Sequence, residues 1–134
     1  ILLICFFSDT GGYVIGKVVG GKKLTKISPN KTISGSVGSF IFSLFPSLVV
    51  LYFSEQSNLF LSTTKSFWQI ILVSLFLSFI CQAGDLFISF LKRRAKIKDT
   101  GSILPGHGGL LDRIDGLIFV LPAAYILGKI FLIL

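Results

Sequence analysis

Long uncharged apolar segments are the feature that most constrains how this chain can fold. A helix needs about 20 mostly apolar residues to cross the roughly 30 Å hydrocarbon core of a bilayer. Such segments occupy residues 36–54 and 66–84, and the second pattern continues to residue 91. Residues 116–134 form a third segment that only Lys129 interrupts, and residues 1–19 resemble a fourth. Backbone polar groups in lipid must be satisfied internally, which favours helices. The sequence therefore predicts an all-α, polytopic integral membrane bundle of about four transmembrane helices.

The composition also favours a membrane protein. Of the 134 residues, 52% are hydrophobic and 14% charged, with a mean hydropathy of +0.85, whereas an average soluble domain has about 25% charged residues. Disordered, collagen-like and disulfide-rich secreted chains are excluded. Cys5 and Cys81 lie in apolar runs without a CxxC or Cys/His companion, and we interpret them as small buried hydrophobes. Because the chain opens inside an apolar run and lacks methionine, we interpret residues 1–134 as a single membrane domain of a longer protein.

Positive charges are concentrated in two of the three connections between these segments. The charged residues of the connection between the second and third segments are only Glu55 and Lys65. The basic residues of the other two are Lys17, Lys22, Lys23, Lys26 and Lys31, and then Lys92, Arg93, Arg94, Lys96, Lys98 and Arg113. Short basic loops stay on the cytoplasmic side, so both are predicted to face the cytoplasm. From charge alone, topology and contact with anionic lipid headgroups would explain them.

Acidic residues are placed where a membrane makes them costly. Five of the six are Asp9, Asp85, Asp99, Asp112 and Asp115, within or beside the apolar segments or in the last basic loop. A carboxylate in a membrane helix costs about 3 kcal/mol and is usually functional, paired or facing a wet cavity. Asp85 belongs to a polar stripe with three- or four-residue spacing, formed by Ser74, Ser78, Gln82, Asp85, Ser89 and Lys92. The stripe predicts one wall of a hydrophilic cavity, and a structural salt bridge is the alternative interpretation of Asp85.

Asp112 and Asp115 are three residues apart, so they share one face at the start of the fourth segment. Helix capping and compensation of the helix dipole are the alternative explanation of this pair. Carboxylates in an oxygen-rich surround suit a hard cation, above all Mg²⁺. Zinc is disfavoured, because the chain has one histidine and no cysteine cluster.

Two loops that precede apolar segments carry residues suited to phosphate binding. They are SPNKTISG at 28–35 and LPGHGG at 104–109. Backbone N–H groups, hydroxyls and a lysine at a helix N-terminus favour an anion. Neither loop matches the G-x-x-x-x-G-K-[ST] pattern, and a tight turn is the alternative for each. His107 by itself is more often a hydrogen-bonded loop residue than a catalyst.

A larger pattern resembles the signature of the phosphatidate cytidylyltransferase family, also called CDP-diacylglycerol synthases. It consists of SFLKR at 89–93, KDTG at 98–101, LPGHGG at 104–109 and LDRID at 111–115. SDTGGY at 8–13, the block at 28–35 and QAGDL at 82–86 resemble further motifs of that family. Together they cover about half of the chain. The resemblance implies that the chain is the carboxy-terminal catalytic portion of a longer enzyme.

The resemblance implies that CTP and phosphatidic acid give CDP-diacylglycerol and pyrophosphate, with Mg²⁺ required and K⁺ able to share the site. It assigns Asp85 and Asp112 to the metal ions, with Asp115 as a further or indirect ligand and Asp9 nearby. The remaining expected catalytic residues are Lys92, Arg93, Lys98, Asp99, His107 and Arg113. The expected nucleotide-binding and phosphate-binding residues are Ser28, Lys31, Thr32, Ser34, Gly108 and Gly109.

The expected partners are CTP, phosphatidic acid and membrane lipids, and not nucleic acid. A homodimer stays open, since Gly35, Ser39 and Ser43 could serve close helix contacts. The expected location is a bacterial-type inner membrane with the active site facing the cytoplasm. The alternatives are a membrane kinase of polyprenyl or phytyl alcohols, a CDP-archaeol-type synthase, or a cation channel or transporter. A channel would not need two basic, glycine-containing loops on one face.

The charge distribution makes a testable prediction about topology. Residues 22, 31, 96 and 113 should lie on the cytoplasmic side, with residues 55 and 65 on the other side. Single cysteines introduced at these positions can be labelled with a membrane-impermeant reagent in sealed vesicles of known orientation. Labelling of positions 55 and 96 from the same side would contradict the two-loop topology.

Overall fold

The regular structure of the chain consists of long helices. The computed structural model describes residues 1–25, 28, 31–56, 67–97 and 111–133. Within these residues there are four helices: α1 (Leu2–Val19), α2 (Ile33–Gln56), α3 (Phe67–Arg94) and α4 (Leu111–Ile133). By length and composition, α1, α2 and α3 are long and apolar enough to cross a membrane. The predicted all-α membrane bundle is confirmed.

Two helices begin earlier than the uncharged segments that predicted them. Helix α2 begins at Ile33, where Thr32 Oγ1 accepts a hydrogen bond from the Gly35 N–H at 3.0 Å. This contact satisfies one of the free N–H groups of the first turn. Helix α4 begins at Leu111, so its first turns include the positions of Asp112 and Asp115. Apolar patterning marks the part of a helix that suits lipid, whereas the helix itself can extend further into the polar interface.

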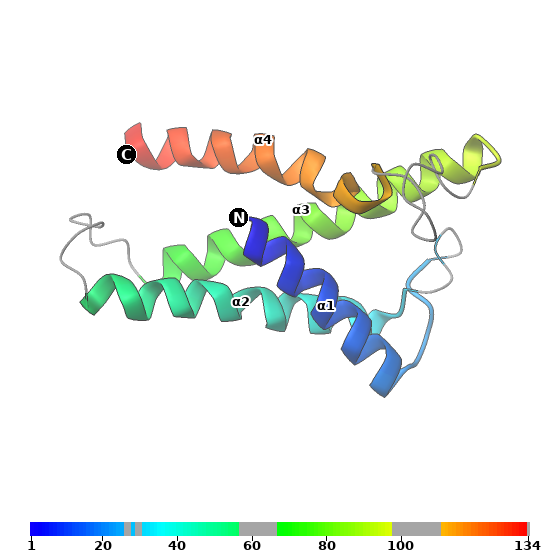
Figure 1. The fold of residues 1–134 in the computed structure, drawn as a ribbon, viewed down its shortest axis with the longest axis horizontal. Coiled ribbons are helices and arrows are strands. Elements are labelled where there is room, and N and C mark those ends of the chain that lie inside the picture. The colour runs from blue at the N-terminus through cyan, green and yellow to red at the C-terminus, as the bar shows by residue number, and fades with distance from the viewer. Residues whose placement is uncertain (26–27, 29–30, 57–66, 98–110, 134) are drawn as a thin grey trace.

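The helices form two closely packed pairs that meet along α3. Helix α1 packs mainly on α2, and α3 mainly on α4, while α3 also contacts α2 and α1. Figure 1 shows the connection from α1 to α2 at the same end of the bundle as the carboxy-terminal end of α3 and the start of α4. The described basic residues of both connections therefore lie at one end of the molecule, as the charge pattern predicts.

Small and polar side chains occupy the interior, and large apolar ones face outward. Ser8, Ser43 and Ser78 are fully buried, whereas Phe6 and Trp68 are more than half exposed. Lipid is as apolar as these exposed side chains, so close packing and interhelical hydrogen bonds hold membrane helices together. The buried apolar core consists of Cys5, Leu77, Cys81 and Val120. Both cysteines are thus buried among apolar residues, as expected.

Glycines allow α1 and α2 to approach each other closely. A Cβ atom placed on Gly35 would lie 2.6 Å from the Gly12 carbonyl oxygen and 3.3 Å from Gly16 Cα. Gly35 is buried in this contact, as are Ser39 and Ser43 further along α2. Gly35, Ser39 and Ser43, which the sequence indicated for close helix contacts, are therefore buried between helices of the same chain.

The glycine contact yields a prediction about stability. Gly35→Ala should destabilise the fold by about 1–3 kcal/mol, because the new methyl group meets backbone atoms that cannot move aside without separating the helices. Gly128→Ala is the matched control, since among the described residues no atom beyond its own stretch of helix lies within 4 Å of a Cβ there. It should be neutral, or stabilising by up to about 1 kcal/mol through helix propensity. Unfolding in mixed detergent micelles, followed by circular dichroism, measures both, and equal effects would refute the close contact.

Candidate functional site

A polar cavity lies between α1, α2 and α3 at the end of the bundle that holds the α1–α2 connection. Its volume is about 280 Å³. The residues that line it are Asp9, Gly12, Tyr13, Leu24, Ser28, Lys31, Thr32, Gly35, Ser36, Ser39, Gln82 and Asp85. The fold thus brings four of the predicted site residues together, namely Ser28, Lys31, Thr32 and Asp85, and places Asp9 beside them.

The α1–α2 connection folds back on itself and carries Lys31 to this cavity. Gly20 and Gly21, which follow α1, have φ angles of 63° and 109°, a region that glycine adopts without strain. The returning chain then pairs with the outgoing one, and the Leu24 N–H donates to the Lys31 carbonyl oxygen at 2.8 Å. Lys23 and Thr32 form an antiparallel bridge at the same place.

An ion pair in the cavity joins α3 to the residues just before α2. The Lys31 ammonium donates a hydrogen bond to Oδ2 of Asp85. The two side chains are 30% and 26% exposed, so solvent still reaches the pair. Asp9 on α1 is near enough for its charge to interact with both residues. The salt bridge considered as an alternative for Asp85 is therefore present, and it lies inside the cavity.

A second ion pair connects α3 to α4. Lys92 Nζ lies 3.7 Å from Asp115 Oδ2, and the side chains are 14% and 13% exposed. The other carboxylate oxygen of Asp115 accepts a hydrogen bond from the Gly116 N–H at 2.9 Å. The charge of Asp115 also interacts with that of Asp85. Asp115, which is predicted to be a further or indirect metal ligand, is thus close to Asp85 but is ion-paired with Lys92.

Part of the polar stripe of α3 lines the polar cavity, and another part forms hydrogen bonds with neighbouring helices. Gln82 and Asp85 line the polar cavity, as predicted. Ser78 instead lies buried against Ser8 of α1, with 2.9 Å between the hydroxyl oxygens, and Ser74 is hydrogen-bonded to Ser47 of α2. The prediction that the stripe forms a wall of a hydrophilic cavity is wrong for these two serines, because their hydroxyls join helices.

The hydroxyls at the start of α2 mainly organise the backbone. Thr32 Oγ1 caps the helix and lies 3.0 Å from Ser34 Oγ, and Ser34 in turn donates to the Gly20 carbonyl oxygen. Ser28 and Thr32 line the cavity, whereas Ser34 is not among its lining residues. A nucleotide-binding role for Ser34 would require its hydroxyl to leave Gly20.

The polar cavity is also lined by residues that were not among the predicted site residues. Ser36 and Ser39 face it from α2, and the Ser36 hydroxyl donates to Gln82 Oε1 at 2.5 Å. Gly12 and Tyr13 contribute from α1. The three-residue spacing of Ser36 and Ser39 on a helix, and the SDTGGY block, were the available signals.

Several predicted residues cannot be placed in this cavity. Arg93 is exposed at the end of α3, and Ser89 is half-buried on the same helix. Asp112 and Arg113 belong to the first turn of α4, and their side chains lie outside the described part of the structure. Lys98, Asp99, His107, Gly108 and Gly109 also lie outside the described residues.

The donor atoms around the cavity suit a hard cation. Asp9 and Asp85 supply carboxylates, and Ser36, Ser39 and Gln82 supply neutral oxygens. Mg²⁺ prefers oxygen ligands and keeps several waters, so it needs only one or two protein carboxylates. Among the described residues, no three His, Cys, Asp or Glu side chains form a ready-made metal cluster. The residues present therefore fit Mg²⁺ better than a metal that demands a complete protein cage.

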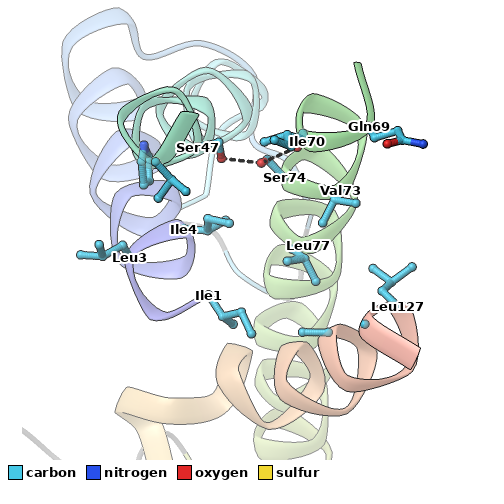
Figure 2. Close-up of a pocket in the computed structure, with 14 residues that line it drawn as sticks. Ile1, Leu3, Ile4, Ser47, Gln69, Ile70, Val73, Ser74, Leu77 and Leu127 are labelled. Carbon is cyan, nitrogen blue, oxygen red and sulfur yellow. Dashed lines mark hydrogen bonds between the residues drawn. The ribbon is translucent and has the colours of Figure 1, made fainter. Parts of the chain in front are cut away.

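A second cavity lies at the opposite end of the bundle and is mainly apolar. Its volume is about 400 Å³. Figure 2 shows Ile4, Val73, Leu77 and Leu127 around it, with the hydrogen-bonded Ser47 and Ser74 at its edge. No charged residue lines this second cavity in the described part of the chain. Of these two cavities, only the first has charged groups suited to phosphate and metal among its described lining residues.

The fold and the first cavity define an integral membrane protein whose helices enclose a charged, oxygen-rich site. The sequence model of the cytidylyltransferase family matches residues 1–131. The chain belongs to this family.

The chain is similar to bacterial proteins named phosphatidate cytidylyltransferase. Those of Staphylococcus haemolyticus (strain JCSC1435) and Staphylococcus aureus (strain COL) are each 46% identical to it over 126 residues, which are 93% of this chain. The protein of Staphylococcus saprophyticus is 43% identical over the same length. The chain spans 46% of the length of these relatives.

A solved structure described as an intramembrane enzyme for archaeal membrane lipid biosynthesis has a similar fold. The TM-score is 0.56 at 21% sequence identity, and the match covers 95% of this chain and 77% of the other. At this identity the likeness concerns the fold alone.

Proposed function

We propose that the protein containing this chain transfers the cytidylyl group of CTP to phosphatidic acid, producing CDP-diacylglycerol and pyrophosphate. The names of its relatives support this reaction, although the chain spans 46% of their length. The observation that carries the proposal is the cavity in which Lys31, Asp9 and Asp85 meet beneath the basic end of the bundle. The negative charges of a lipid phosphate and of a nucleotide triphosphate can be neutralised by lysine and by a metal ion. The carboxylates of Asp9 and Asp85 can bind such a metal ion.

The proposed reaction is a displacement at phosphorus. A phosphate oxygen of phosphatidic acid forms a bond to the α-phosphorus of CTP, and the bond from that phosphorus to the pyrophosphate oxygen breaks. No protein nucleophile is required, so the protein acts by positioning the substrates and neutralising charge. Lysine and arginine side chains at the basic end are suited to both tasks.

The proposed metal ligands are Asp85, Asp112 and Asp115. Bound Mg²⁺ would offset the negative charge on the reacting phosphates, and K⁺ could share the site. Support comes from Asp85 and Asp9 facing the same oxygen-lined cavity, and from Asp115 lying near Asp85. Asp112 is three positions before Asp115 on α4, and therefore shares its side of that helix.

The proposed phosphate contacts are divided between the two basic connections. Ser28, Lys31, Thr32 and Ser34 would hold the nucleotide, together with Gly108 and Gly109, while Asp99 and His107 are proposed for the same site. Lys92, Arg93, Lys98 and Arg113 would neutralise the lipid phosphate and part of the triphosphate. Asp85 and Lys92 are seven positions apart, which corresponds to about 10 Å along the helix. The cavity would therefore lie just below the headgroup level, on the cytoplasmic side of a bacterial inner membrane.

The metal assignment predicts the effect of removing a single charge. Asp85→Asn and Asp112→Asn each preserve side-chain size but remove a carboxylate, so cytidylyl transfer should fall by about 100-fold or more. The assay is CTP-dependent formation of CDP-diacylglycerol by the full-length protein, with membrane insertion measured in parallel. Near-normal turnover of either variant at ordinary Mg²⁺ would refute that residue's assignment.

The two basic connections should differ in their kinetic effects. Lys31→Ala should raise the apparent KM for CTP about tenfold, because a charge-assisted phosphate contact is worth about 1.5–3 kcal/mol. Arg93→Ala should instead raise the apparent KM for phosphatidic acid. Lys22→Ala is the control, since this exposed lysine shares the first connection but does not line the cavity. The reverse pattern, with Lys31 affecting only lipid and Arg93 only CTP, would show that the allocation is wrong.

A further inference from the structure

The ion pair between Lys31 and Asp85 suggests how the negative charge of the site is partly balanced in the absence of ligands. We propose that Lys31 serves as a tethered counter-cation that exchanges partners: it leaves Asp85 for a phosphate group when a divalent metal ion binds that carboxylate. The inference rests on the proposed function, because it assumes that metal and phosphate meet in this cavity. It adds that the two ligands bind synergistically and that Lys31 opposes the metal when phosphate is absent.

The charges in the cavity support the exchange. Asp9 and Asp85 come from different helices, and both interact with the single ammonium group of Lys31. An uncompensated carboxylate among membrane helices is costly, so Lys31 stabilises the site before ligands arrive. A metal ion alone would meet this ammonium, and a phosphate alone would meet two carboxylates. Only the two together give every charge a partner.

The position of Lys31 makes the exchange physically feasible. It lies immediately before Thr32, which caps α2, so its released ammonium would remain near a helix N-terminus that favours anions. Its long stem is flexible, and both members of the pair are more than a quarter exposed. The pair between Lys92 and Asp115 is about half as exposed, and Asp115 also holds the Gly116 N–H. We therefore assign the exchange to Lys31 and a fixed α3–α4 contact to the second pair.

The test is a reversal in the sign of one substitution's effect on binding. The full-length protein in nanodiscs is titrated with Mn²⁺ alone, followed by electron paramagnetic resonance, and with the Mn²⁺–tripolyphosphate complex, followed by calorimetry. Lys31→Gln should bind Mn²⁺ alone at least about fivefold more tightly than the wild type, because the competing cation is gone. It should bind Mn²⁺–tripolyphosphate about tenfold more weakly, because a phosphate contact is lost. Lys22→Gln, at an exposed position outside the cavity, should change neither affinity.

A purely structural lysine would not produce this reversal. Weaker or unchanged binding of Mn²⁺ alone by folded Lys31→Gln would overturn the exchange. If that variant does not fold, the wild type decides the matter: tripolyphosphate must raise its Mn²⁺ affinity at least about fivefold, and no enhancement would overturn the proposal.

Product formation from CTP and phosphatidic acid is measured separately. Reversal without CDP-diacylglycerol formation would support the exchange and contradict the proposed function. Product formation without reversal would contradict the exchange alone.

Discussion

A carboxylate within an apolar helix has to be neutralised, and the organisation of the polar end of this protein follows from that requirement. Asp85 is held by Lys31, which reaches it only because the chain after α1 reverses direction and returns along itself. The ion pair fixes the start of α2 against α3 and places Asp9 of α1 beside the same ammonium. The contact that makes the acid tolerable in the membrane thus also assembles a cavity from three helices.

Close helix packing is the second condition for that cavity. Gly35 meets Gly12 at a distance that leaves no room for a side chain, and buried serines take the place of large apolar groups between helices. Gln82 extends this arrangement into the cavity, because its amide accepts a hydrogen bond from Ser36. Small residues therefore serve both to bring backbones together and to position polar groups, while many of the phenylalanines, such as Phe6 and Phe79, are exposed on the outside of the bundle.

The two cavities divide the bundle into chemically different halves. Asp85 and Lys31 belong to a polar cavity near the basic end, whereas the larger cavity at the other end is lined almost entirely by apolar side chains. Between them, the hydrogen bond of Ser8 with Ser78 joins α1 to α3 in the buried interior. This separation places the charged lining residues at the basic end of the bundle and the apolar cavity at the other end.

The helices could be predicted from the sequence because hydrophobic length and backbone hydrogen bonding are local properties, and the motifs around Asp85 pointed to a site. A salt bridge of Asp85 was one of the interpretations, but the partners in the two ion pairs could not be predicted. Lys92 shares a stripe with Asp85 on α3 but pairs with Asp115 of α4, while Asp85 pairs with Lys31, which lies 54 positions away in the sequence. Periodicity defines which residues share one helix face, but not which neighbouring helix meets that face. Packing between helices determines this. The close contact of α1 and α2 at Gly35 and the length of the Lys31 side chain bring the Lys31 ammonium to Asp85.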